Sequence, residues 1–277
     1  MLSNTKLSFI GCGVMAESII AGSLRGNLVN PSQVSASHPR SNRRDELKTK
    51  YSINVFEDNK EAAANSGGDN NSLVVLCVKP QRLEGVLEEL AEVVSPDQLI
   101  LSIVAGATIE TISSALGSEK VARTMPNTPS QIGHGITVWN STEKVSENER
   151  SQIKSLLNAL GRELYVENEH MIDMATSLSA TGPTYVFLVM EALTDAGVHL
   201  GFSRDMAKEL VQETMLGAVL FAIESDKHPA ELRNMVTSPG GTSADAIYQM
   251  EKGSLRTVLS KAVFAAYKKA VELGEKP

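Results

Sequence analysis

Residues 6–16 restrict the possible folds of this chain more than any other stretch. An apolar strand expected over 6–10 runs into Gly11-x-Gly13-x-x-Ala16, and an apolar helix is expected from residue 14 to about residue 24. This is the G-x-G-x-x-A form of the dinucleotide-binding turn, in which Gly11 permits the tight turn, Gly13 lets a pyrophosphate approach the backbone and Ala16 lets the helix pack on the strand. The helix N-terminus would offer unpaired N–H groups to the phosphates.

A glycine turn with a purely structural role is the alternative. The strand before the turn and the helix after it favour coenzyme binding, because the mechanism requires both. The predicted cofactor-binding residues at this turn are Ile10, Gly11, Cys12, Gly13, Val14 and Met15.

Strand and helix patterns alternate after this turn as far as residue 167. The apolar runs at 73–78 and 99–104 are typical of strands buried on both faces of a parallel sheet. From residue 171 onward the pattern is helical. We therefore predict an α/β, Rossmann-like doubly wound sheet over residues 1–166, followed by an all-α C-terminal domain over residues 167–277. Two of its helices carry so few polar residues that we expect a dimer to bury them.

Composition excludes several classes of partner. The 277 residues are 42% hydrophobic and carry a formal net charge of −7, which argues against nucleic acid or an anionic membrane as partner. No apolar run reaches the length of a transmembrane helix. The first strand begins so early that no targeting peptide is expected. Cys12 and Cys77 lack C-x-x-C spacing and are expected to be small buried thiols, so the expected location is the cytoplasm.

The segment after the second predicted strand, 33–37, indicates which nicotinamide coenzyme is used. NAD-binding folds place an Asp or Glu near this strand end, but here no carboxylate occurs before Asp45. Hydroxyl and guanidinium groups suit a 2′-phosphate, which favours NADPH over NADH. The alternative is a solvated basic loop, which applies best to Arg43 and Arg44. The candidate residues are Ser37, His38, Arg40 and Ser41, with Ser37 and Arg40 the strongest.

Other candidates follow the remaining strands, because ligands of doubly wound sheets lie beyond the carboxyl ends of the strands. Asn59 could touch the adenosine, although a role at the helix cap with Asp58 is the stronger expectation. The rigid loop over 125–129 contains two prolines and is expected to be non-helical, so it could position a nicotinamide or simply end a strand. The candidates at this edge are Asn59, Val78, Lys79, Pro80, Ala105 and Asn127.

A second candidate site lies far downstream, over residues 238–243. Its Pro-Gly-Gly turn leads into a helix start, an arrangement that can bind a carboxylate, and nearby hydroxyl groups add donors. An ordinary helix-capping turn is the alternative. The predicted helix over 184–200 contains no lysine and only His199 near its end, and no residue cluster has metal-ligand spacing. A reaction that needs little general-base help, such as reduction of a C=N bond, therefore fits.

The chain resembles the pyrroline-5-carboxylate reductase family along nearly its whole length. The segments that carry the resemblance are Phe9-Ile10-Gly11-Cys12-Gly13-Val14-Met15-Ala16, Val78-Lys79-Pro80-Gln81, Arg123-Thr124-Met125-Pro126-Asn127-Thr128-Pro129, Ser179-Ala180-Thr181-Gly182-Pro183-Thr184-Tyr185 and Val236-Thr237-Ser238-Pro239-Gly240-Gly241-Thr242-Ser243.

The resemblance implies the last step of proline synthesis. NADPH, or NADH as the weaker coenzyme, would give a hydride to the imine carbon of 1-pyrroline-5-carboxylate and yield L-proline. It implies that the coenzyme contacts the glycine turn, the loop after the second strand, the 78–80 turn and the strand end formed by Ile103, Val104 and Ala105. It also implies dimers that interlock through their helical domains and often assemble into decamers.

The resemblance assigns the substrate carboxylate to residues 236–243. Ser243 stands where the family commonly has threonine, but it keeps the hydroxyl and is the candidate catalytic proton donor. The implied substrate-binding residues are Val236, Thr237, Ser238, Gly240, Gly241, Thr242 and Ser243. A hydroxy-acid dehydrogenase of the same two-domain build and a nucleotide-sensing protein without turnover are the alternatives.

Overall fold

The computed structural model describes residues 2, 4–67 and 71–274. The chain divides into two compact units, Met1–Thr181 with Ala266–Pro277, and Gly182–Ala265. Within the described residues, the first unit holds one eight-stranded sheet of order β3-β2-β1-β4-β5-β6-β7-β8. Its strands are β1 (Lys6–Ile10), β2 (Val34–Ser37), β3 (Asn54–Phe56), β4 (Ser72–Leu76), β5 (Leu99–Ser102), β6 (Val121–Met125), β7 (Gly135–Ser141) and β8 (Gly161–Tyr165).

The first six strands are parallel and give the doubly wound order that the sequence predicts. The strand β7 runs antiparallel to β6, and β8 pairs parallel to β7. The helices of this unit are α1 (Val14–Arg25), α2 (Ser41–Tyr51), α3 (Asn59–Ala64), α4 (Leu83–Leu90), α5 (Ile109–Leu116), α6 (Glu147–Asn158) and α7 (His170–Ala175), with shorter turns η1 (Pro31–Gln33), η2 (Pro80–Arg82), η3 (Thr128–Ile132) and the π-helix η4 (Thr176–Ala180).

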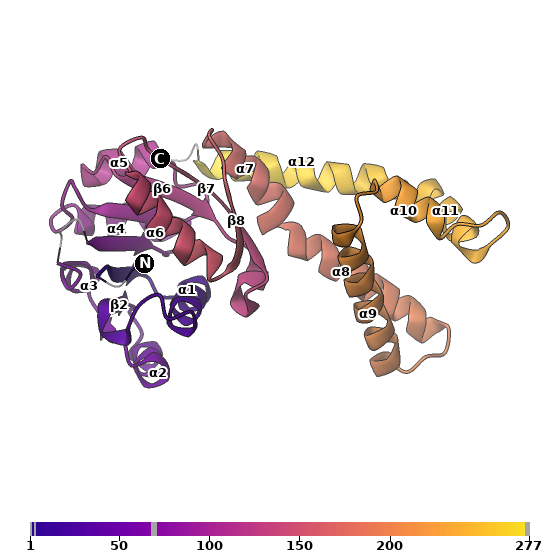
Figure 1. The fold of residues 1–277 in the computed structure, drawn as a ribbon, viewed down its shortest axis with the longest axis horizontal. Coiled ribbons are helices and arrows are strands. Elements are labelled where there is room, and N and C mark those ends of the chain that lie inside the picture. The colour runs from indigo at the N-terminus through magenta and orange to yellow at the C-terminus, as the bar shows by residue number, and fades with distance from the viewer. Residues whose placement is uncertain (1, 3, 68–70, 275–277) are drawn as a thin grey trace. The chain divides into compact units, whose positions relative to one another are not determined.

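Two hydrophobic clusters pack between the sheet and its helices. Figure 1 shows the ribbon of the sheet with these helices around it. In β4, Leu73 and Val75 belong to one cluster with α1, α2 and α6, whereas Val74 and Leu76 belong to the other with α3, α4 and α5. This alternation follows from the two-residue period of a strand. It explains why the strand reads as one continuous apolar run.

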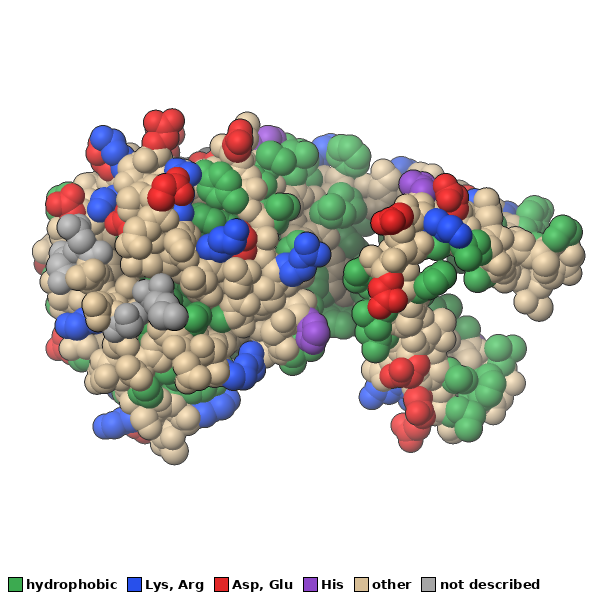
Figure 2. Space-filling view, viewed as in Figure 1, with side chains coloured by type: hydrophobic (Ala, Val, Ile, Leu, Met, Phe, Trp, Pro, Cys, Tyr) green, Lys and Arg blue, Asp and Glu red, His purple; other side chains and the backbone are tan. Residues whose placement is uncertain are grey.

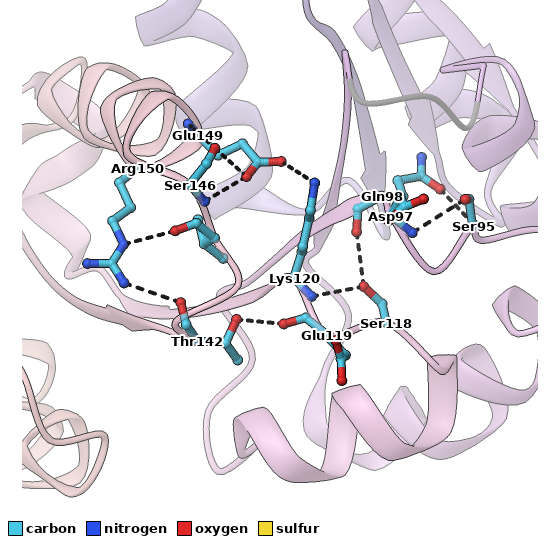
Figure 3. A network of polar contacts seen from close by, with 11 residues as sticks. Ser95, Asp97, Gln98, Ser118, Glu119, Lys120, Thr142, Ser146, Glu149 and Arg150 are labelled. Atoms are coloured by element: carbon cyan, nitrogen blue, oxygen red, sulfur yellow. Dashed lines mark hydrogen bonds and ion pairs between the residues drawn. The ribbon is translucent and has the colours of Figure 1, made fainter.

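A polar network closes the amino edge of the sheet, at the starts of β5 and β6 (Figure 3). Lys120 Nζ lies 3.0 Å from Glu149 Oε1, and the other carboxylate oxygen accepts from Ser146 at the start of α6. Burial alone would raise the pKa of Glu149, but the bonds from Ser146 and Lys120 outweigh it and lower the pKa. Ser118 Oγ donates to the Gln98 carbonyl at 3.1 Å. These bonds stabilise the amino edge of the sheet. The candidate coenzyme residues lie at the opposite edge, beyond the carboxyl ends of the strands.

Some predicted element boundaries differ from the structure. The α4 helix ends at Leu90 rather than near residue 94, because Val93 and Val94 form turns that donate to the Leu90 carbonyl. The prediction of a wholly non-helical loop over 125–129 is wrong, since η3 begins within it. Pro129 occupies the first turn of η3, where its missing N–H costs no hydrogen bond.

The compact units do not meet at the predicted boundary between residues 166 and 167. Ile172 of α7 is fully buried with Met125, Val138 and Val166, so α7 and η4 belong to the sheet-containing unit. The end of the last helix also belongs to it, because a Cβ on Gly106 would lie 2.7 Å from the backbone of Leu273. The division of function at residue 166 stays a prediction.

The second unit is helical. Its helices are α8 (Gly182–His199), α9 (Arg204–Glu224), α10 (Pro229–Met235), α11 (Thr242–Lys252) and the first part of α12 (Leu255–Gly274). Ser203 caps α9 as predicted, accepting from Met206 N. Of the described residues of α8 to α11, Ala207 alone is buried. Large apolar side chains stay exposed on these helices, as Figure 2 shows. Among the described helices, none is long and apolar enough to cross a membrane.

Candidate coenzyme and substrate sites

Two glycines shape the turn between β1 and α1. Gly11 has φ +84°, and a Cβ there would lie 2.5 Å from Val78 Cγ1, so only glycine allows the end of β4 to approach this turn. A Cβ on Gly13 would have no described atom within 4 Å. Gly13 is also the N-cap of α1, and no described side chain caps that helix start. The open space and uncapped N–H groups fit a pyrophosphate.

Ser37, at the end of β2, holds this turn. Its hydroxyl accepts from Gly11 N at 3.0 Å and donates to Asn59 Oδ1 at 2.7 Å, and its carbonyl accepts from Cys12 N at 2.8 Å. The structure thus brings four predicted coenzyme residues together, Gly11, Cys12, Ser37 and Asn59. Ser37 is fully buried, so any role that it has in binding a phosphate would pass through the turn that it holds. Asn59 also donates to Glu89 Oε2 of α4 at 2.8 Å.

The loop after Ser37 carries three arginines with different partners. Arg43 forms ion pairs with Glu17 and Glu46, and Arg44 with Glu57. Arg40 is exposed, and its guanidinium has no hydrogen bond or ion pair with the described part of the chain. Of the three arginines in this loop, Arg40 is therefore the one whose guanidinium has no partner among the described residues, and its contact with a 2′-phosphate stays a prediction.

Two neighbours of Arg40 in this loop also have defined surroundings. Ser41 is exposed at the first position of α2. Burial, and next the charge of Arg40, lower the pKa of His38, whose Nδ1 accepts from Arg40 N. The lowered pKa favours the neutral form of the His38 imidazole.

The other residues of the glycine turn differ in accessibility. Ile10 and Cys12 are fully buried, so only their backbone groups could face a ligand. Burial raises the pKa of Cys12 to about 12, and both cysteines are free thiols. Val14 is 59% exposed and Met15 is half-buried, which leaves their side chains able to border a coenzyme.

The carboxyl edges of β4 and β5 lie next to the glycine turn. Cys77 N donates to the Ile10 carbonyl, and Ile103 N donates to the Leu76 carbonyl. The predicted residues that follow these strands have graded exposure: Val78, Pro80, Ile103 and Ala105 are half-buried, Lys79 is exposed and Val104 is buried. Pro80 and Ala105 also line a cavity of about 620 Å³ that extends between α4 and α5.

Asn127 fixes the loop after β6. Its Oδ1 accepts from Ile136 N at 3.0 Å, and its Nδ2 donates to the Ser179 carbonyl at 3.2 Å. Its amide is therefore occupied on both sides, and contact with a nicotinamide stays a prediction.

Sequence reasoning missed two charged clusters in the first unit. Arg123, in β6, is 1% exposed and pairs with Glu169 and Asp173 of the segment that begins α7. Its Nε has no hydrogen-bond partner among the described residues. Glu17 of α1 binds three side chains of α2. The available signal for Arg123 was a charged residue within a predicted buried strand, which indicates that a partner must be buried with it. The sequence could not identify the partners, because they lie 46 and 50 residues away.

The predicted substrate loop joins α10 to α11. Val236 is 69% exposed at the end of α10. Gly240 has φ +72°, and Gly241 N donates to the Ser238 carbonyl at 3.0 Å. A Cβ on Gly241 would lie 2.5 Å from Ser238 Oγ and 3.2 Å from the Ser238 carbonyl oxygen, so a larger residue here would displace the Ser238 hydroxyl.

The first turn of α11 follows directly. Gly241 is its N-cap and offers no capping side chain, Thr242 is exposed and Ser243 is half-buried. Thr237 differs from the expectation that it is a free donor, because its hydroxyl already donates to the Arg233 carbonyl at 2.7 Å. Donors to a bound carboxylate would therefore come from Ser238, Thr242, Ser243 and the helix N–H groups.

A Rossmann-type coenzyme turn followed by a helical unit defines the chain as an NAD(P)-dependent oxidoreductase. Residues 6–106 match the family described as NADP oxidoreductase coenzyme F420-dependent, and residues 169–273 match pyrroline-5-carboxylate reductase dimerisation. The chain belongs to the pyrroline-5-carboxylate reductase family, because its similarity to such enzymes extends along its whole length.

Individual relatives make the extent of this similarity clear. The pyrroline-5-carboxylate reductase of Pseudomonas aeruginosa is 39% identical over 99% of this chain and 98% of that protein. The enzyme of Arabidopsis thaliana is 36% identical over 98% of this chain and 96% of that protein. The Coxiella burnetii enzyme structure superposes with a TM-score of 0.88 at 34% identity, covering 99% of this chain and all of that one. The Plasmodium falciparum enzyme, crystallised with NADP bound, also gives 0.88 at 30% identity, covering 99% of each chain.

Proposed function

We propose that this protein reduces 1-pyrroline-5-carboxylate to L-proline, the final step of proline biosynthesis, with NADPH as the preferred coenzyme and NADH as the weaker one. The observation that carries the proposal is the full-length similarity to pyrroline-5-carboxylate reductases, because it includes both the glycine turn and the 236–243 loop. The imine is already an electrophile, so positioning is the main demand on the protein.

The first unit would hold the coenzyme. The N–H groups at the start of α1 would receive the pyrophosphate in the open space beside Gly13, and Arg40 would receive the 2′-phosphate. The residues at the ends of β4 and β5, from Val78 to Pro80 and from Ile103 to Ala105, would border the nicotinamide half together with Asn127. When bound, NADPH supplies the hydride that the imine carbon receives.

The 236–243 loop would hold the substrate. Uncapped N–H groups at the start of α11 would donate to the carboxylate, and Gly241, which has no side chain, would leave these groups accessible. The Ser243 hydroxyl would donate a hydrogen bond to the ring nitrogen of the neutral imine. It would pass a proton, replaced from water, to that nitrogen as the carbon receives the hydride, which gives the secondary amine of proline.

Self-association is expected through the helical unit, because its described helices expose large apolar side chains and match the family's dimerisation domain. We propose a dimer that interlocks through these helices, and decamers built from such dimers. The two free cysteines support a cytoplasmic location as part of the same proposal.

Steady-state assays test the proposal. Purified protein should oxidise NADPH when 1-pyrroline-5-carboxylate is added, with L-proline as product, and should not reduce NADP⁺ with hydroxy acids. Turnover of hydroxy acids alone would identify a dehydrogenase of the same build. NADPH binding without consumption of the imine would identify a nucleotide-sensing protein.

A further inference from the structure

The Glu17 carboxylate joins the two helices that begin at the proposed phosphate sites. Glu17 lies in the first turn of α1, directly after the glycine turn, and its side chain is 17% exposed. Its Oε1 accepts from Lys50 Nζ at 2.8 Å and from Tyr51 Oη at 2.7 Å, and its Oε2 accepts from Arg43 Nη2. All three donors belong to α2.

These bonds keep Glu17 ionised. Burial alone would raise its pKa, but the hydrogen bonds from Lys50, Arg43 and Tyr51 outweigh burial and lower the pKa to about 2. An unpaired carboxylate in this first turn would repel a pyrophosphate, and the two cations of α2 compensate it. The cluster therefore links α2 to α1 without adding net negative charge to the proposed pyrophosphate site.

The position of α2 determines the position of Arg40. Arg40 is the residue that precedes α2 and serves as its N-cap, so a shift of α2 moves Arg40 with it. Arg43 is held by Glu17 and Glu46, while Arg44 donates to the carbonyls of His38 and Pro39. The position of Arg40 thus depends on α2. Of the three arginines in this loop, Arg40 alone has a guanidinium without a partner among the described residues, so it can bind a ligand.

We propose that Glu17 is a positioning residue for coenzyme selectivity: it fastens α2 to α1 so that Arg40 reaches the 2′-phosphate while the pyrophosphate lies on the start of α1. The inference rests on the coenzyme sites of the proposed function. Glu17 touches neither phosphate and acts through Arg43, Lys50 and Tyr51.

The matched pair Glu17→Gln and Glu46→Gln tests this inference. Both remove one negative charge next to Arg43, but Glu46 is 55% exposed and pairs with Arg43 within α2, so only Glu17 reaches α1. Calorimetric titration with adenosine 2′,5′-bisphosphate and with adenosine 5′-diphosphate separates the 2′-phosphate contribution from general nucleotide binding, and needs no turnover.

Glu17→Gln should weaken the 2′,5′-bisphosphate about tenfold, as expected when a charge-assisted bond is misplaced. It should weaken the 5′-diphosphate by less than about twofold, and Glu46→Gln should change neither. Equal weakening of both nucleotides, or tighter binding of the bisphosphate to Glu17→Gln, would overturn the inference.

Tyr51→Phe provides a second variant in case Glu17→Gln does not fold. It removes one bond to Glu17 without changing charge, and it should lower the preference for the bisphosphate in the same direction by a smaller factor. An unchanged preference in this variant contradicts the inference. Normal nucleotide titrations in a protein that never reduces the imine would refute the proposed function alone.

Discussion

Three arginines lie within the seven positions that follow β2, and their partners decide what each can do. Arg43 and Arg44 each pair with a carboxylate, whereas Arg40 has no protein partner in the described part of the chain. The sequence predicted that this loop would suit a 2′-phosphate, and it favoured Arg40 over its neighbours. It could not reveal Glu17 as an anchor, because Arg43 and Tyr51 are 26 and 34 residues away and no local pattern connects them.

Arg40→Ala should raise the KM for NADPH by about 10- to 100-fold, because hydrogen bonds to a charged group are worth about 1.5–3 kcal/mol. The KM for NADH should change little, since NADH lacks the 2′-phosphate. Arg40→Lys keeps the charge and should recover part of the NADPH affinity. Equal losses for both coenzymes would show that Arg40 does not read the 2′-phosphate.

The depressed pKa of Glu17 predicts how its contribution to stability changes with pH. The folded-state pKa is about 2 against an ordinary value of 4.5, so the stabilisation is fully present above pH 4.5 and is lost as the pH falls towards 2. Urea unfolding of the apoprotein should show wild type more stable than Glu17→Gln near neutral pH. That difference should shrink below pH 4.5, and a difference that stays constant to pH 2 would contradict the assignment.

At the scale of elements, the carboxyl edge of the sheet and the start of α11 were predictable because their signals are local. Glycine spacing and apolar runs depend on residues close in sequence, and β1, α1, β4 and the 236–243 turn form as expected. Other features depend on distant contacts. The buried Arg123 requires Glu169 and Asp173, and the inclusion of α7 in the sheet-containing unit follows from that same packing.

Gly241→Val should disrupt the substrate loop and spare the coenzyme. Its Cβ would fall 2.5 Å from Ser238 Oγ, so the Ser238 hydroxyl must rotate away, and the branched valine side chain would occupy space next to the start of α11. The KM for 1-pyrroline-5-carboxylate should rise at least about tenfold, a loss of roughly 1.4 kcal/mol of binding. The Kd for NADPH, measured by fluorescence titration, serves as the folding control and should stay unchanged. An unchanged KM for the imine would remove this loop from the site.

At the scale of the whole molecule, the second unit lacks a core of its own. Among its described helices Leu220 is 49% exposed, Phe187 60% and Phe264 63%, which a monomer in water would leave uncovered. The sequence predicted the apolar helices, but not which of their faces stay open. Assembly with another copy is the route by which the family's dimerisation domain would bury them.

Leu220→Asp should therefore convert the protein towards a monomer, because an unpaired carboxylate in an apolar interface costs several kcal/mol. Sedimentation velocity should show a shift towards the mass of one 29.7 kDa chain. Ile132→Asp alters an apolar residue of the first unit that is 72% exposed, and it should leave the assembly intact. A monomeric wild type, or a dimer that survives Leu220→Asp, would contradict this view of α9.

The central claim is that this protein transfers a hydride from NADPH to the imine carbon of 1-pyrroline-5-carboxylate. The most direct test uses NADPH with both hydrogens at C4 of the nicotinamide replaced by deuterium, followed by NMR of the product. The account predicts L-proline with one deuterium at C5. Proline without deuterium, or coenzyme oxidation with no proline formed, would contradict it.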